Sequence, residues 1–274
     1  MTVQEQATQT GADSEVIQYE LDGGVATIWL NRPEVKNCVN WDLLTGLGAA
    51  LERADEDPEV RVVLIRGRGN TFCAGADLNM LDAEFLGTTN NSVRIAQVSA
   101  RTFDRAFNLG KPTIAVVEGY AVAGGLELAL WADLRVAAAD ATFGVYCRRW
   151  GVPLIDGGTI RLPRLIGQSR ALDLILTGRG VDGVEAERIG LVNRVVPAGE
   201  ALDAAIALAS EIAALPQTCL RSDRASAYAQ WGDDLADALV REVDVGLATI
   251  ASGETAEGAR RFASGAGRHG KSAT

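Results

Sequence analysis

The chain has 274 residues, of which 47% are hydrophobic and 23% are charged, and its formal net charge is −10. This composition is that of a globular protein with a sizeable core, and it excludes a disordered chain. The acidic balance and the aromatic content of 5% argue against a basic or base-stacking surface for nucleic acid. The one histidine, His269, lies near the C-terminus, which removes histidine-based hydrolases and metal sites unless the tail folds back.

The four cysteines are widely spaced, which predicts free thiols in a reducing compartment. Residues 1–15 are polar and lack the basic-then-apolar pattern of a secretion signal, so we expect a disordered lead-in. No apolar run reaches the roughly 18 residues that span a bilayer. The sequence therefore predicts a cytoplasmic protein without a membrane segment.

Short strands and helices alternate along the first two thirds of the chain. Strands over 16–21 and 25–30 flank an Asp-Gly-Gly turn and predict a hairpin. Asn40 then caps a helix that ends near residue 57 and carries leucines and alanines on one face. Further strands are expected over 60–66, 113–118, 134–138 and 192–196, and further helices over 92–109, 126–131, 157–166, 169–176 and 184–189.

The last part of the chain is helical. A helix is expected over 201–215, followed by a long helix over 225–250 whose apolar residues step by three and four. That apolar stripe either faces the core or forms an assembly surface, and both interpretations stay open. We expect four regions: a lead-in over 1–15, an α/β core over 16–200, a helical oligomerisation region over 201–263 and a mobile tail over 264–274.

Two glycine-rich turns are candidates for a ligand site. Residues 119–127 join a strand, a glycine-rich turn and a helix start, where unpaired N–H groups favour negative charge. Neither residues 67–72 nor residues 119–126 complete a nucleotide-binding fingerprint, because Phe72 replaces the third glycine of the first and Gly125-Leu126 replace the Lys-Ser/Thr of the second, so a developing oxyanion is the next candidate ligand. Glu127, in the first helical turn, is a candidate general acid or base there. Its alternative role is that of an exposed carboxylate that satisfies the helix dipole. The second turn, residues 72–78, offers backbone N–H groups to a ligand in the same way.

These turns and several other segments resemble the crotonase, or enoyl-CoA hydratase/isomerase, superfamily, in the right order over roughly residues 16–262. The matching segments are Leu-Asn-Arg-Pro at 30–33, Phe-Cys-Ala-Gly-Ala-Asp-Leu at 72–78, Glu-Gly-Tyr-Ala-Val-Ala-Gly-Gly-Leu-Glu-Leu at 118–128, Ala-Asp-Leu-Arg at 132–135, Phe-Gly at 143–144, Gly-Gly-Thr at 157–159, Arg-Leu-Pro at 161–163, Glu-Ala at 185–186 and Gly-Leu-Val at 190–192.

The resemblance implies an α/β fold, a crotonase-type spiral of ββα repeats followed by C-terminal helices that form homotrimers or homohexamers. It implies an acyl-CoA thioester as substrate and no cofactor besides the coenzyme A of that substrate. The backbone N–H groups of Ala76 and Gly124 would form an oxyanion hole for the thioester enolate. Ala74, Asp77 and Leu78 would line the path of the CoA and acyl groups, together with Ala76 and Gly124.

Hydratases of this family use two glutamates on one water. The resemblance maps the first to Glu127 and the second to Cys147, whose thiol is a poor substitute for a carboxylate. Two arginines follow Cys147, and if they lie close they would lower its pKa and favour a nucleophilic thiol. Asp156 is the other candidate for the second carboxylate. Its alternative role is the N-cap of the helix expected over 157–166.

We therefore predict an enoyl-CoA hydratase, with an isomerase or another reaction of the superfamily as the enzyme alternative because the second glutamate is missing. A non-catalytic CoA-thioester-binding or RNA-binding member is the alternative of another class. RNA binding in such relatives uses a lysine-rich first helix. Here the helix after Asn40 carries five acidic residues against Arg53, which disfavours that alternative.

Overall fold

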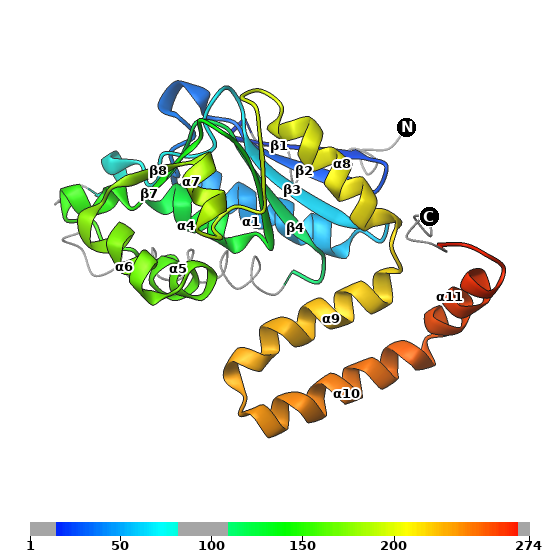
Figure 1. Cartoon of the computed structure of the whole chain (residues 1–274). Helices are drawn as coiled ribbons and strands as arrows, with labels where there is room; N and C mark the ends of the chain where they lie inside the picture. The colour runs from blue at the N-terminus through cyan, green and yellow to red at the C-terminus, as the bar shows by residue number, and fades with distance from the viewer. Residues whose placement is uncertain (1–14, 82–108, 268–274) are drawn as a thin grey trace, which may run out of the picture.

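The computed structural model describes residues 15–81 and 109–267. Its main sheet has six strands in the order β1-β2-β3-β4-β6-β9, in which β1 is antiparallel to β2 and the other neighbours are parallel (Figure 1). The strands are β1 (Ile17–Asp22), β2 (Val25–Leu30), β3 (Val62–Gly67), β4 (Thr113–Val117), β6 (Leu134–Ala138) and β9 (Arg194–Val196).

A second, smaller sheet has the order β5-β7-β8. Its strands are only three residues long: β5 (Tyr120–Val122), β7 (Thr142–Gly144) and β8 (Gly180–Asp182). The sequence analysis did not predict them, because three residues are too few to show an alternating pattern. The α/β class that it predicted is confirmed.

Helices cover both faces of the main sheet. On one face α1 (Trp41–Glu56) packs on β1 and β2, and the side chain of Asn40 accepts a hydrogen bond from the Leu43 N–H as its N-cap. On the other face α8 (Ala201–Ala214) packs on β3, β4 and β6 through alanines spaced four residues apart. The small side chains let this helix lie close to the strands. The core therefore includes α8, and the helices that leave it begin later than residue 201, where the sequence analysis placed the division.

Four further helices, which alternate with strands in the sequence before α8, complete the core. The α4 helix begins directly after β5, and its buried residues are Gly125 to Trp131. Of the other three, α5 and α6 lie between β7 and β8, and α7 follows β8. These helices are α4 (Gly124–Trp131), α5 (Gly158–Ile166), α6 (Gln168–Thr177) and α7 (Gly183–Arg188).

The chain then runs outward as an arm of three helices, which we call the C-terminal arm (Figure 1). They are α9 (Gln217–Ala229), α10 (Leu235–Ala251) and α11 (Glu254–Ala263). The single long helix predicted over 225–250 is therefore wrong. Gly232 ends a short turn of helix after α9, and the Asp234 side chain caps α10 by accepting from the Asp237 N–H. Both are ordinary helix stop and start signals, which the continuous apolar spacing obscured.

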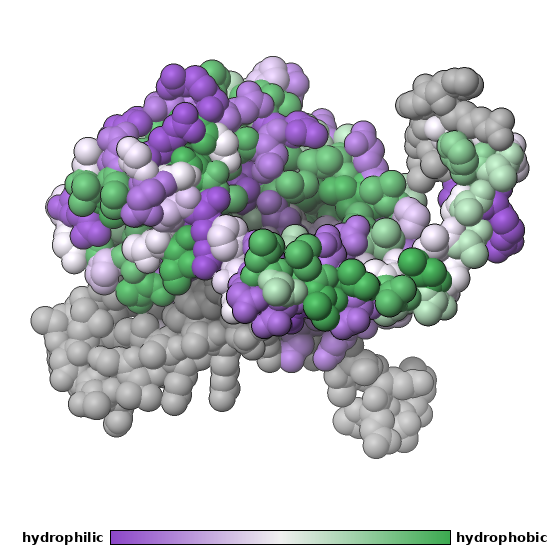
Figure 2. Space-filling model, turned by 60° about the horizontal axis from the view of Figure 1, so that its bottom comes forward, coloured by the Kyte–Doolittle hydropathy of each residue, from purple (hydrophilic) through white to green (hydrophobic). Residues whose placement is uncertain are grey.

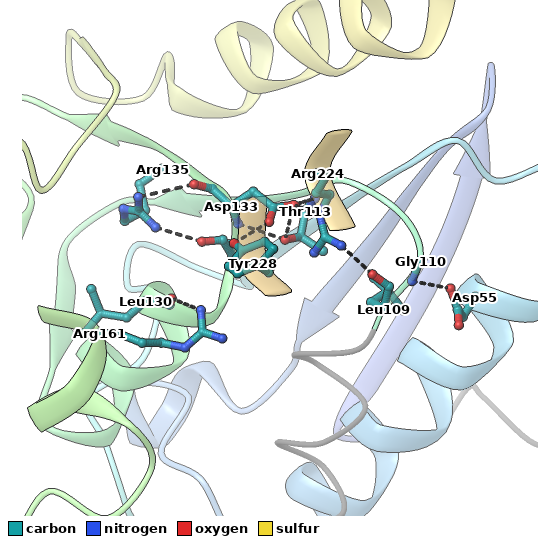
Figure 3. A network of polar contacts seen from close by, with 11 residues as sticks. Asp55, Leu109, Gly110, Thr113, Leu130, Asp133, Arg135, Arg161, Arg224 and Tyr228 are labelled. Carbon is teal, nitrogen blue, oxygen red and sulfur yellow. Dashed lines mark hydrogen bonds and ion pairs between the residues drawn. The ribbon is translucent and has the colours of Figure 1, made fainter. Parts of the chain in front are cut away.

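One partly buried carboxylate fastens the C-terminal arm to the core (Figure 3). Asp133, just after α4, accepts hydrogen bonds from Arg224 Nε at 2.8 Å and from the Tyr228 hydroxyl at 2.6 Å, both on α9. It also accepts from the backbone N–H of Thr113 at the start of β4. Burial and the charge of Asp133 raise the pKa of Tyr228 to about 12. The arm is thus tied to the end of the same helix that begins with Gly124.

The apolar stripe of α10 does not face the core of this chain. Its side chains are more than half exposed, and Figure 2 shows hydrophobic residues on the surface of the C-terminal arm. They include Leu235, Leu239, Val240, Val243, Leu247 and Ile250. The core-facing interpretation of the stripe is therefore wrong for the isolated chain.

Three further sequence expectations concern residues outside those described. The helix expected over 92–109 falls there except for Leu109, and so do residues 1–14 of the lead-in and most of the tail. In the part of the chain that the structure describes, no helix has the length and apolar character needed to cross a membrane.

Candidate active site

All eight candidate site residues line one pocket of about 770 Å³. The pocket lies where the ends of β3 and β5, the start of α4 and the loop before α5 meet. Apolar side chains make most of its wall, including Val122, Tyr146, Trp150 and Ile155. The candidate residues that it brings together are Ala74, Ala76, Asp77, Leu78, Gly124, Glu127, Cys147 and Asp156.

The loop after β3 presents a free N–H group to this pocket. Val39 pairs with this loop by donating its N–H to the Gly75 carbonyl and accepting from the Asp77 N–H. This parallel pairing leaves the N–H of Ala76, the residue between them, directed away from Val39. Gly75 has φ +100°, and a Cβ there would lie 2.8 Å from the Ala123 Cβ, so the close approach of the two turns requires glycine.

The turn into α4 presents a second free N–H. Ala123 has φ +54°, a left-handed conformation that is costly for a residue with a side chain and that bends the chain sharply from β5 into α4. Gly124 is the first residue of the helix, so its N–H has no helical acceptor. A Cβ on Gly124 would lie 3.6 Å from the Ala76 nitrogen. Neither N–H has a partner among the described residues, and the two form a pair of donors at the pocket wall.

Glu127 is 2% exposed, so its interpretation as an exposed first-turn carboxylate is wrong. Its Oε1 accepts hydrogen bonds from the backbone N–H groups of Asp156 at 2.9 Å and of Gly158 at 2.8 Å. A Cβ on Gly158 would lie 2.9 Å from Glu127 Oε1, so only glycine fits there. Burial, and then the charge of Asp156, raise the pKa of Glu127 to about 7, against the effect of these hydrogen bonds.

Asp156 brings a second carboxyl group to the same pocket. Its Oδ2 lies 3.8 Å from the position that a Cβ on Gly124 would occupy, beside the pair of N–H donors. Burial raises the pKa of Asp156 to about 6. The residue that precedes α5 as its N-cap is Gly157, without a side-chain bond, so the interpretation of Asp156 as a helix cap is wrong. Two carboxyl groups that titrate near neutral pH can hold one proton between them.

Cys147 lines the pocket from a short turn of helix, Tyr146–Trp150. Burial and then the charge of Glu127 raise the pKa of its thiol, although Arg148 acts in the opposite direction. Arg148 and Arg149 donate instead to the backbone carbonyls of Ile175 and Gly178. The two arginines therefore do not activate the thiol, and the hypothesis of a nucleophilic Cys147 loses its physical basis.

Lys36 is a pocket residue that the sequence analysis missed. Its ammonium lies 5.1 Å from the centre of the Tyr120 ring, and both side chains are exposed at the pocket. Asp77, also on the wall, is neutralised by an ion pair of 3.1 Å with Arg32. Burial acts to raise the pKa of Asp77, but the hydrogen bonds from Arg32 and Asn79 outweigh it and lower that pKa. No spacing in the sequence signals that the loop after β2 reaches this wall.

The site thus combines two N–H donors, two protonatable carboxyl groups and an apolar wall. Such a set can stabilise an oxyanion and move a proton at a neighbouring carbon. Within residues 15–81 and 109–267, no group of three or more His, Cys, Asp or Glu side chains is placed to hold a metal ion.

The raised pKa of Glu127 predicts how stability depends on pH. A group whose pKa is raised on folding stabilises the fold below its ordinary pKa of 4.5, and that stabilisation is lost as the pH rises through about 7. Glu127→Gln keeps an acceptor but carries no charge. We expect it to raise the free energy of unfolding by up to about 3 kcal/mol at pH 8 and by little at pH 4.5. Urea titrations at both pH values, with the exposed Glu187→Gln as the control, measure this difference; equal stability of both variants at pH 8 would contradict it.

Comparison with known proteins agrees with this geometry. Residues 20–266 match the family model described as enoyl-CoA hydratase/isomerase. The chain is 36% identical to a probable enoyl-CoA hydratase of Mycobacterium bovis over 90% of this chain and 95% of the relative. It is 39% identical to a putative enoyl-CoA hydratase of Thermus thermophilus over 90% and 97% of the two chains.

Among solved structures, the enoyl-CoA hydratase of Bacillus anthracis matches with a TM-score of 0.84 and 34% identity, over 91% of this chain and 96% of that chain. The family-model match and the identity to these relatives both extend over most of the chain. The chain therefore belongs to the enoyl-CoA hydratase/isomerase family.

Proposed function

We propose that the protein hydrates a 2-enoyl-CoA thioester, with Glu127 and Asp156 as its two catalytic carboxyl groups. The observation that carries this proposal is the placement of both groups in one apolar pocket, beside the N–H donors of Ala76 and Gly124. Asp156 then replaces the carboxylate that the family resemblance expects at Cys147. Relatives named as hydratases support the reaction class.

In the proposed mechanism the thioester oxygen lies between the Ala76 and Gly124 N–H groups. Glu127 takes a proton from a water molecule, whose oxygen bonds to C3 of the enoyl group. The electron pair of the C2=C3 bond moves into an enolate, whose oxygen the two N–H groups stabilise. Each such donor is typically worth about 3–4 kcal/mol of the barrier. Asp156, protonated and beside Gly124, then delivers its proton to C2, and the proton held by Glu127 passes back to Asp156, which completes the addition of water and restores the pair.

Hydration needs one group to accept a proton and another to donate one. The two pKa values, about 7 and about 6, leave the pair partly protonated near neutral pH. The pair therefore meets both needs without a histidine or a metal-bound water. An isomerase that moves a proton between two carbons needs only one of the two groups. The need for the second carboxyl group therefore distinguishes a hydratase from an isomerase.

We expect Asp156→Asn and Glu127→Gln each to lower the hydration rate of crotonyl-CoA by about 10²–10⁴. Asp140→Asn, an exposed position outside the pocket, is the matched control and should keep the native rate. The assay follows loss of the enoyl absorbance, with products identified by mass. Full hydration by Asp156→Asn would contradict the role of Asp156 and favour a mechanism with one glutamate.

Lys36 supports the CoA part of the proposal. It is the cation among the described lining residues, and the phosphates of CoA are anions. We expect Lys36→Ala to raise KM for crotonyl-CoA roughly three- to tenfold and Lys36→Arg to have little effect. KM for the N-acetylcysteamine thioester, which lacks the phosphates, should stay unchanged. An equal rise with both thioesters would show that Lys36 does not contact the phosphates.

We also infer that the spiral core assembles into a homotrimer or homohexamer through the C-terminal arm. The exposed apolar side chains of α10 support this, since a face of that kind is normally covered by a partner. Light scattering at micromolar concentration should give the mass of three or six chains. Leu239→Glu together with Val243→Glu should reduce that mass, because both charges would be buried without partners. A native monomer would contradict the inference.

A further inference from the structure

Two side chains of α4 hold the loop that carries Asp156. Glu127 binds the backbone N–H groups of Asp156 and Gly158 through Oε1. Trp131, one turn further along the helix, donates from its indole Nε1 to the carbonyl oxygen of Asp156 over 3.0 Å. Residues four apart lie on the same face of a helix, which explains how both side chains reach the same loop.

The bond from Trp131 acts on the peptide group between Asp156 and Gly157. The orientation of this peptide fixes the direction of the Asp156 side chain, which precedes it. Through Gly157, at φ +93°, it also fixes the direction of the Gly158 N–H, which follows it. Trp131 is 5% exposed, so its N–H has little access to water and the bond is well protected. Without that donor, the Asp156 carbonyl would lose a buried partner and the peptide would turn to find another.

We propose that Trp131 is a positioning residue of the site, whose indole N–H holds the Asp156 carbonyl and thereby places both the Asp156 carboxyl group and the N–H groups that bind Glu127. This inference rests on the proposed roles of Glu127 and Asp156. It adds a residue that touches neither the substrate nor the reacting atoms and that acts through the loop.

The direction of the effect follows from the bonds to Glu127. Hydrogen bonds to a carboxylate favour its charged form, and those from Gly158 and Asp156 lower the pKa of Glu127. If the loop moves when Trp131 loses its N–H, these bonds weaken and the pKa of Glu127 rises further. A tryptophan that only fills space would leave this pKa unchanged when a ring of similar size replaces it.

The test compares Trp131→Phe with the native protein and with Trp29→Phe. Trp29 is the matched control, because it is also buried, lies outside the pocket, and has an indole N–H without a partner among the described residues. The first readout is a ¹³C NMR titration of the Glu127 carboxyl group, assigned with Glu127→Gln, which needs no turnover. The second is the pH dependence of crotonyl-CoA hydration.

We expect Trp131→Phe to raise the pKa of Glu127 by about half a unit or more and to move the acid limb of the rate profile in the same direction. The turnover number should fall about tenfold with KM within about twofold, since orientation is lost rather than binding. Trp29→Phe should match the native protein in both readouts. A folded Trp131→Phe with the native pKa and the native rate profile would overturn the proposal.

Two provisions keep the test decisive. If Trp131→Phe does not fold, replacement of Trp131 by 3-benzothienylalanine keeps the ring shape and removes only the N–H, and the same shift is expected. If the native protein hydrates no enoyl-CoA, the proposed function fails, while the NMR titration still decides whether Trp131 positions the loop.

Discussion

The burial of the Glu127 carboxyl group is the constraint on which the rest of the site depends. An ionised carboxylate in an apolar wall is costly, and the fold lowers that cost with two backbone N–H donors rather than with a cation. The donors are Asp156 in the loop before α5 and Gly158 at the start of α5, so the same bonds that hold Glu127 also place Asp156 beside it. Burial raises the pKa of Glu127 to about 7, against the effect of these bonds, and that of Asp156 to about 6, so both groups titrate near neutral pH, which is the condition for acid–base chemistry.

The fold supplies the other half of the chemistry through two sharp turns. One follows β3 and leaves the Ala76 N–H unpaired, and the other strains Ala123 to begin α4 with a free Gly124 N–H. A parallel bridge between Cys73 and Ala121 brings the turn after β3 beside the turn after β5. The partly buried Asp133 fixes the far end of α4 to the C-terminal arm (Figure 3). The helix that carries Glu127 is thus held at both ends.

Most of the core was predictable from the sequence, because its strands and helices are long enough to show their periods. The hairpin of β1 and β2 and the Asn40 cap follow from local signals that act over a few residues. The short strands β5, β7 and β8 were not predicted, because three residues are too few to show an alternating pattern. The break between α9 and α10 was not predicted, because the Gly-Asp pair that marks it lies within a continuous apolar spacing.

The candidate residues of the site were also predicted from the sequence, largely through the family resemblance, and in the structure they line one pocket. The sequence could not predict the burial, the direction or the hydrogen-bond partners of these side chains. Burial of Glu127, the direction of Asp156 and the turning away of Arg148 and Arg149 depend on contacts between segments far apart in the chain. The same holds for Lys36 and Trp131, whose importance appears only when the loops they contact are in place.

The central claim is that this pocket adds water across a double bond. Incubation of the native protein with crotonyl-CoA in ¹⁸O-labelled water, followed by mass analysis of the product, tests it most directly. We expect a 3-hydroxyacyl-CoA that carries one ¹⁸O atom on C3. A product of unchanged mass with a displaced double bond, or the recovery of unaltered crotonyl-CoA, would contradict it.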